Sequence, residues 1–253
     1  MLQIIIFLSV FYILLYLYSL KYNNNSIVDL FWWPVFGFIA ITTYISESMF
    51  TLSQTLVTLL VLAWSCRLFF NILSKKWWNI HEEDPRYAVW REQWNYVKIR
   101  SFFQVFALQL LLALIVATPI WIINTSSGFE PSLWLSFVWA AIAFFWLLYE
   151  SRADGELAGF IKNKESGDIM DSGLRKFHRY PQYFGESVFW LGISIIAAQV
   201  SFWSFVWFWV IFLLVRYVSG VPQLEKRYEW NKKFEKYAEK TPIFFPDFRK
   251  IFD

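Results

Sequence analysis

Seven long apolar stretches restrict the folds open to this chain. About 20 apolar residues, wound as a helix, cross the roughly 30 Å hydrocarbon core of a bilayer. Of the 253 residues, 57% are hydrophobic and only 17% are charged, which is too little charge for a soluble domain of this length. The ten-residue alternation typical of an outer-membrane barrel is missing from the sequence. We therefore predict an all-α integral membrane bundle of about seven transmembrane helices, at residues 2–20, 29–48, 53–73, 101–123, 132–149, 185–200 and 201–217.

The positions of the charges predict how such a bundle is oriented. The last two spans are short and nearly continuous, so we expect a tight helical hairpin that turns near residues 199–201. The far-side loops carry Glu47 and Glu130 and no basic residue. Because Lys and Arg collect on the cytoplasmic side, we expect the N-terminus outside, the C-terminus in the cytoplasm, and one membrane-embedded domain over residues 1–253. The 23 Lys and Arg all fall in, or in helix ends next to, residues 21–28, 74–100, 150–184 and 218–253.

The segment GLRKFHRYPQYFGE, residues 173–186, combines cations, aromatic rings and an acid at the start of an apolar helix. Cations beside rings suit a phosphorylated aromatic ligand such as a nucleotide. Glu186 lies at or just inside the bilayer boundary, where a carboxylate is costly without a partner and is a candidate functional residue. The same features also fit a basic membrane anchor with a helix-capping acid. The sequence leaves both interpretations open.

Asp29 begins the second apolar stretch and is followed by three consecutive rings. Ser26 and Asp29 have the spacing of a helix capping box, which predicts a structural cap. The alternative places Asp29 in a polar pocket between helices. Arg67 lies deep in the third stretch, where it must either extend to the cytoplasmic surface or pair with an acid or a phosphate inside the bundle.

Two further charged segments are candidates. In residues 82–94, Asp84 and Pro85 start a turn or helix on which Arg86 and Tyr87 follow. Those two side chains would bind a phosphate and stack on a base, or else form an amphipathic face on anionic lipid. Asp154, where the fifth span leaves the membrane, would contact a ribose or phosphate, or take part in helix-end ion pairs.

Several common sites are absent from the sequence. It contains neither a GxGxxG dinucleotide turn nor a GxxxxGK phosphate loop. His81 and His178 are the two histidines, and with one cysteine they are too few for a His/Cys metal centre. Basic residues are spread over one membrane face, which argues against nucleic-acid binding. We expect neither a metal site nor a nucleic-acid partner.

Together, these motifs resemble the steroid 5-alpha-reductase-like family of membrane enzymes, in particular its bacterial branch. That branch usually reads RHPNYFGE where this chain reads RYPQYFGE, so Tyr180 and Gln182 replace His and Asn. This departure affects cofactor contacts or substrate choice. The motifs that carry the resemblance are, in order, SIVDLFWW (26–33), CRL (66–68), EDPRY (83–87), AD (153–154), GLRKFHRYPQYFGE (173–186), VSGVPQLEKR (218–227) and FFP (244–246).

The resemblance implies an enzyme of the bacterial inner membrane that uses NADPH. Its reaction would reduce a carbon–carbon double bond conjugated to a carbonyl, in a hydrophobic lipid of steroid or isoprenoid type. Steroid-reducing members polarise the ketone with a glutamate–tyrosine pair, for which Asp29 is the nearest candidate acid. The resemblance implies catalytic roles for Asp29 and Glu186. It implies cofactor contacts for Arg67, Arg86, Tyr87, Asp154, Arg179, Gln182, Tyr183, Glu225 and Arg227.

Two other functions compete with this one. A membrane methyltransferase with a related helical core would bind S-adenosylmethionine, and a non-enzymatic protein of the same fold would bind lipid alone. The motifs EDPRY, FGE and SGVPQLEK favour the reductase-like branch over the methyltransferases.

Overall fold

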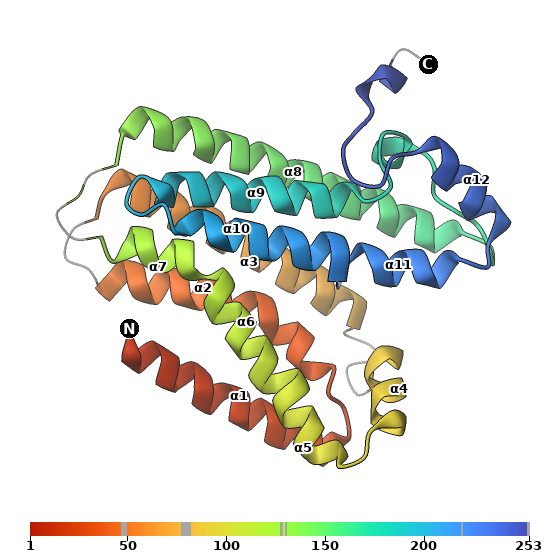
Figure 1. Cartoon of the computed structure of the whole chain (residues 1–253), viewed down its shortest axis with the longest axis horizontal. Coiled ribbons are helices and arrows are strands. Elements are labelled where there is room, and N and C mark those ends of the chain that lie inside the picture. Colours follow the sequence, from red (N-terminus) through yellow and green to blue (C-terminus); the bar gives the residue numbers. More distant parts are fainter. Residues whose placement is uncertain (47–49, 77–81, 127–128, 130, 219, 252–253) are drawn as a thin grey trace. The chain divides into compact units, whose positions relative to one another are not determined.

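A computed structural model describes the chain except for residues 47–49, 77–81, 127–128, 130, 219 and 252–253. All regular secondary structure in the described ranges is helical, which confirms the predicted all-α class (Figure 1). Glu47, His81 and Glu130 lie outside the described residues. Contacts divide the chain into two compact units, Met1–Leu133 and Trp134–Asp253. Each unit holds its own group of candidate residues.

The first unit is built around the packing of α2 against α3, with α7 contacting both. Phe36 of α2 and Trp64 of α3 are fully buried, with ring centroids 5.5 Å apart in an edge-to-face arrangement. This geometry suits aromatic pairs because a positive ring edge meets a negative face. The helices are α1 (Leu2–Tyr22), α2 (Ile27–Ser46), α3 (Leu52–Lys76), α4 (Pro85–Gln93), α5 (Val97–Ser101), the π-helical turn η2 (Phe102–Ala107), α6 (Leu108–Val116) and α7 (Thr118–Asn124).

The second unit contains the predicted hairpin. Helix α9 ends at Ala198 and α10 begins at Ser204, so the chain turns between them as expected. The Ser204 hydroxyl donates to the carbonyl of Ser194 at 2.8 Å and holds the two helices together. The elements are α8 (Leu133–Asn163), the 3-10 turn η3 (Gly173–Lys176), α9 (Pro181–Ala198), α10 (Ser204–Leu213), the π-helical turn η4 (Leu214–Val218), α11 (Val221–Tyr228), α12 (Lys232–Lys240) and the 3-10 turn η5 (Phe248–Ile251).

Six segments of the described chain are long and apolar enough to cross a membrane, which makes this a multi-pass membrane protein. Helix α9 is not among the six, because Gln182 and Glu186 make its first two turns polar. Helix α8 also differs from expectation, since it continues as helix far beyond residue 149. The six segments are Leu2–Tyr22, Ile27–Ser46, Leu52–Ser74, Val97–Val116, Leu133–Asn163 and Ser204–Tyr228.

Two glycines let α9 approach α8 closely. A methyl group added at Gly192 would lie 3.0 Å from both the Trp139 carbonyl oxygen and the Ala143 methyl carbon. One added at Gly185 would lie 3.2 Å from the Trp146 carbonyl oxygen. Small residues at helix contacts let backbones pack without a side chain between them, which favours helix association in a membrane.

We expect Gly192→Ala to lower the stability of the detergent-purified protein, by about 1–3 kcal/mol, because a helix backbone must shift to admit the methyl group. Gly159→Ala on α8 is the matched control, since a methyl group there meets open space. It should be neutral or stabilise by up to about 1 kcal/mol, as alanine is the better helix former. Thermal unfolding midpoints test both variants. Equal midpoints for the two would contradict the close approach.

Candidate functional site

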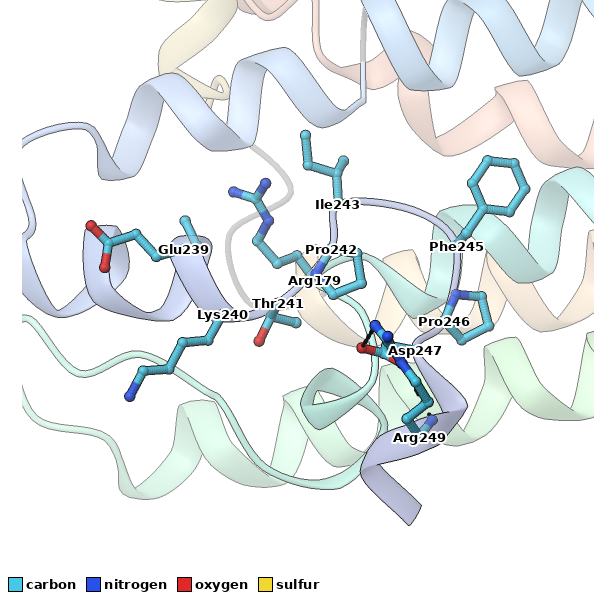
Figure 2. Close-up of a pocket in the computed structure, with 11 residues that line it drawn as sticks. Arg179, Glu239, Lys240, Thr241, Pro242, Ile243, Phe245, Pro246, Asp247 and Arg249 are labelled. Atoms are coloured by element: carbon cyan, nitrogen blue, oxygen red, sulfur yellow. Dashed lines mark hydrogen bonds and ion pairs between the residues drawn. The ribbon is translucent and has the colours of Figure 1, made fainter. Parts of the chain in front are cut away.

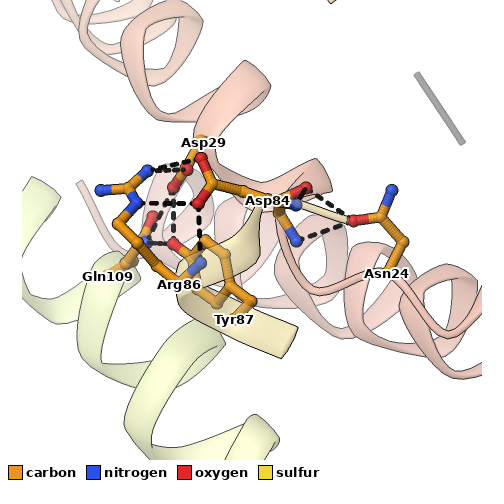
Figure 3. Close-up of polar contacts among 7 residues, drawn as sticks. Asn24, Asp29, Asp84, Arg86, Tyr87 and Gln109 are labelled. Atoms are coloured by element: carbon orange, nitrogen blue, oxygen red, sulfur yellow. Dashed lines mark hydrogen bonds and ion pairs between the residues drawn. The ribbon is translucent and has the colours of Figure 1, made fainter. Parts of the chain in front are cut away.

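In the first unit, Asp29 accepts hydrogen bonds from three side chains on two other helices (Figure 3). The Tyr87 hydroxyl donates to Asp29 Oδ1 at 2.7 Å. Arg86 Nη2 lies 3.3 Å from Asp29 Oδ2. Gln109 Nε2, from α6, donates to Asp29 Oδ1 at 3.4 Å and to the Tyr87 oxygen at 3.1 Å. We call these four residues the Asp29 cluster.

The start of α4 explains why Arg86 and Tyr87 face Asp29. Asp84 caps the helix by accepting from the Arg86 amide at 2.9 Å. Pro85 occupies the first turn, where a backbone N–H has no partner within the helix, so the missing N–H of proline costs nothing. Glu83 accepts from the Asn25 amide at 2.7 Å and so ties this segment to the residues just before α2. The predicted helix start at Asp84 and Pro85 is confirmed.

The capping-box interpretation of Asp29 is wrong. The Ser26 amide donates to Asn24 Oδ1 at 3.0 Å, while the Asp29 carboxylate is engaged by Tyr87, Arg86 and Gln109. A partly buried carboxylate needs partners, and here α4 and α6 supply them. Asp29 therefore belongs to a polar cluster between helices.

Within the Asp29 cluster, the hydroxyl of Tyr87 has a defined direction. It accepts from Gln109 and donates to Asp29, so its proton points at the carboxylate. Tyr87 is only 5% exposed. Burial raises the pKa of its hydroxyl above the usual value, and the charge of Asp29 raises it further. Tyr87 is thus a protonated hydrogen-bond donor at neutral pH.

The second unit builds a basic site from the segment before α9. Gly173 takes the left-handed conformation (φ 59°), and the following Leu174 amide donates to Glu156 Oε2 of α8 at 2.8 Å. That contact holds the turn carrying Arg175, whose guanidinium donates to the Arg179 carbonyl and to Gln182 Oε1. Local geometry thus places Arg175 beside the start of α9.

Arg179 and Tyr180 share one acid. Arg179 Nη1 lies 2.7 Å from Glu225 Oε2, and the Tyr180 hydroxyl donates to Glu225 Oε1 at 2.6 Å. Burial and the bond to Glu225 raise the pKa of Tyr180. Tyr180, which stands where the bacterial branch of the family usually has histidine, therefore links the start of α9 to α11. Tyr183 stacks on Tyr180, with ring centroids 6.0 Å apart.

Arg175, Arg179, Tyr180 and Gln182 line a cavity of about 180 Å³, which we call the arginine cavity. Nε of Arg175 and Nε of Arg179 are buried and have no hydrogen-bond partner within the described part of the chain. Burial lowers the pKa of Arg175, since a guanidinium is costly to remove from water. One acid, Asp168, also lines the cavity and is paired with Lys233 at 2.8 Å. With four cations against it, the chemistry is that of an anion site with stacking surfaces. Its cations are Lys164, Arg175, Arg179 and Arg227, and its rings are Phe160, Tyr180, Tyr228, Phe234 and Tyr237.

The structure brings some predicted residues together and leaves others apart. Arg86 and Tyr87 bind Asp29. Asp154 interacts electrostatically with Arg175. Arg67 is half-buried on α3, and Glu186 is 7% exposed on α9. The predicted residues that meet at the arginine cavity are Arg179, Gln182 and Arg227, with Glu225 bound to Arg179.

Sequence reasoning missed several members of both sites. Gln109 had a signal, because it is one of two glutamines in the apolar residues 102–117. Glu156 and Arg175 stood in segments that were singled out, but spacing gave no reason to select them. Phe234 and Tyr237 come from α12, a short charged helix whose inward face becomes visible only in the fold.

His178 is fully buried between two oxygens. Its Nδ1 lies 2.6 Å from the Phe244 carbonyl oxygen, and its Nε2 lies 2.6 Å from the Tyr149 hydroxyl. A carbonyl only accepts, so Nδ1 carries the proton and Nε2 of the neutral ring accepts from Tyr149. Burial and the nearby Arg175 charge lower the pKa of His178 to about 4, although the bond to the Phe244 carbonyl acts in the opposite direction. The ring is neutral at pH 7.

This low pKa makes stability depend on pH. Between pH 6.5 and 4 the unfolded chain binds the His178 proton more tightly, so stability falls as the pH falls through that range. We expect a loss of about 2 kcal/mol between pH 7 and 5, and none from this group above pH 7. Unfolding midpoints measured against pH for the wild type and His178→Asn test this. An unchanged slope in the variant would assign the effect to other groups.

Comparison with known proteins gives a family and one relative. Residues 15–241 match the family described as "Protein of unknown function (DUF1295)". The relative is "Uncharacterized protein C594.04c" of Schizosaccharomyces pombe, 24% identical over 212 residues, or 72% of this chain. The chain spans 60% of the length of that curated relative. No solved structure matches the chain. Because the family match covers most of the sequence, including both groups of site residues, the chain belongs to the DUF1295 family.

Proposed function

We propose that this protein is an NADPH-dependent membrane reductase that saturates a carbon–carbon double bond conjugated to a carbonyl in a hydrophobic, steroid- or isoprenoid-like lipid. The observation that carries the proposal is the 2.7 Å hydrogen bond between Tyr87 and Asp29. The sequence motifs resemble the steroid 5-alpha-reductase-like family, whose steroid-reducing members polarise a ketone with an acid and a tyrosine. The Asp29 cluster supplies such a pair.

The Tyr87–Asp29 pair suits a reaction in which negative charge develops on a carbonyl oxygen. Addition of hydride to the β-carbon moves charge onto the carbonyl oxygen and forms an enolate, which then takes a proton at the α-carbon. A fixed donor at that oxygen stabilises the transition state more than the ground state. Tyr87, held protonated by burial, is the donor we propose. Without substrate its proton lies on the Asp29 side, so in this proposal the O–H turns from Asp29 to the carbonyl oxygen when the substrate binds. Gln109 still donates to the Tyr87 oxygen, and Arg86 offsets the charge of Asp29.

The arginine cavity fits a phosphate-bearing cofactor. Two buried guanidiniums each have an Nε with no partner among the described residues, and tyrosines line the cavity beside them. Arg175 and Arg179 would hold a phosphate, and Tyr180 and Tyr228 would cover a ring. NADPH, when bound, supplies the hydride. About 180 Å³ accommodates a phosphate-bearing part of a dinucleotide, with the remainder outside this cavity. The proposal keeps Glu186 as a second catalytic residue, which by the resemblance would lie at the cofactor.

The proposal includes a location. With α9 as a seventh crossing, the basic segments share the cytoplasmic face, where NADPH is available. The membrane would be the bacterial inner membrane, and the lipid substrate would enter from it.

Cofactor binding to the detergent-purified protein tests this function. NADPH, NADH and S-adenosylmethionine are titrated separately while the thermal unfolding midpoint is followed, with Glu186→Gln as a comparison. We expect NADPH to raise the midpoint of the wild type and not that of the variant. A rise with S-adenosylmethionine alone would indicate the methyltransferase instead. If none of the three binds, the non-enzymatic lipid-binding role is favoured.

A further inference from the structure

A second hollow in the second unit lies outside the proposed cofactor site. It is a groove of about 600 Å³ between the end of α12 and the segment 241–249 (Figure 2). We call it the tail groove. Arg179 lines both this groove and the arginine cavity, so the two hollows meet at one side chain.

The wall of the tail groove is fixed to the residues before α9. The Arg179 amide donates to the Pro242 carbonyl at 2.9 Å, and the Asp247 amide donates to the Phe177 carbonyl at 3.0 Å. Between these two bonds, His178 donates to the Phe244 carbonyl. Three bonds within a few residues hold this segment in place, so the groove is a formed feature and not a gap beside a loose tail.

The tail groove has a polar and an apolar part. Lys240 and Arg249 are exposed cations, and Arg179 adds a buried guanidinium whose Nε lacks a partner among the described residues. The apolar part is made of Pro242, Ile243, Phe245 and Pro246. Phe245 is 68% exposed, so its ring is open to contact with an acyl chain.

Cations outnumber acids around the tail groove, which favours an anion. Two acids line it: Asp247, paired with Arg249 at 2.8 Å, and the exposed Glu239. Lys250 donates through Nζ to the carbonyls of Lys176 and Lys240 and to the Thr241 hydroxyl, all neutral oxygens. Its positive charge is thus held beside the groove, and no carboxylate is among these three acceptors. Arg249, with Lys250 nearby, holds the pKa of Asp247 below its usual value.

We propose that the tail groove binds an anionic phospholipid, with its phosphate at Lys240 and Arg249 and its acyl chain along Ile243 and Phe245. This occupant also rests on α9 being the seventh crossing, as in the proposed function. Arg179 lies two residues before α9, so the groove would then lie at the level of the lipid headgroups. Basic residues at that level attract anionic lipid headgroups.

The test uses the full-length protein in neutral detergent, with three probes titrated by native mass spectrometry. They are dioctanoyl-phosphatidylglycerol, dioctanoyl-phosphatidylcholine and inorganic phosphate. We expect only the first to be retained at low micromolar excess. Retention of phosphatidylcholine to the same extent would overturn the requirement for an anion. Equal occupancy by inorganic phosphate would show a free-anion site and overturn the lipid.

Two matched pairs of variants localise the site. Lys240→Ala should weaken phosphatidylglycerol binding by roughly fivefold, the effect of one cation near an anionic headgroup. Lys236→Ala removes the same charge from an exposed position of α12 outside the groove and should change nothing. Phe245→Ser should weaken binding, whereas Phe248→Ser, exposed but not lining the groove, should not. Equal losses within either pair would overturn the site. NADPH binding is measured separately, so failure of one proposal leaves the other standing.

Discussion

Replacing Tyr87 by Phe is expected to lower reduction of an enone lipid by about 100- to 1,000-fold, the effect of removing one preorganised donor from a developing oxyanion. The substitution deletes a single oxygen from a side chain that is 5% exposed, so packing is preserved. NADPH affinity should be unchanged, because Tyr87 acts on the substrate carbonyl in this proposal. Loss of NADPH absorbance with a steroid or isoprenoid enone measures turnover.

Asp29→Asn should lower turnover by a similar factor, because the amide lacks the negative charge that both Tyr87 and Arg86 contact. If the two residues act as one unit, the double variant should be hardly slower than either single variant. Tyr96→Phe is the matched control, because Tyr96 is 81% exposed and lies in the same unit. Full turnover in Tyr87→Phe would remove the pair from the mechanism and leave it a structural contact.

Replacing Arg175 by Gln is expected to weaken NADPH binding by about 10- to 100-fold, because a charged hydrogen bond to a phosphate is lost from a buried position. Arg175 also donates to the Arg179 carbonyl and to Gln182, so the variant should be less stable as well. The unfolding midpoint without ligand separates these two effects. Fluorescence or thermal titration with NADPH gives the affinity.

A second pair of variants keeps this test independent of folding. Arg227 is exposed and lines the arginine cavity, whereas its neighbour Lys226 is exposed and does not. Arg227→Gln should weaken NADPH binding, and Lys226→Gln, with the same change in charge, should not. If both variants bind like the wild type, the cofactor contacts lie elsewhere in the chain.

Hydropathy predicted the helical class and most of the spans, because a membrane helix is specified by its length and apolar composition. The hairpin of α9 and α10 followed from two short spans with almost nothing between them. Hydropathy did not predict where helix α8 ends, because the helix continues beyond its apolar part to Asn163. Its last turns are charged, through Arg152, Asp154 and Glu156, yet they continue the helix and hold the turn before Arg175.

The candidate sites are formed by contacts between segments that are far apart in the sequence, and the spacing of motifs does not predict such contacts. Asp29 and Tyr87 are 58 residues apart, and their bond depends on how Glu83 fastens the start of α4 to Asn25. A capping box is a local pattern and was therefore easy to propose for Asp29. Tyr87, the residue that binds Asp29 in the structure, was one of 57 aromatic residues, and nothing in the sequence marked it as the partner of Asp29.

The direction in which the Gln109 side chain points depends on the number of residues in the π-helical turn η2. A π-helical turn holds one residue more than an α-helical turn, so everything after it is rotated by about 100° relative to an uninterrupted α-helix. Gln109 follows η2 by two residues. Its contact with Tyr87 therefore rests on an inserted residue: one deletion between positions 102 and 107 would straighten the helix and turn the amide away, although no residue of the Asp29 cluster had changed.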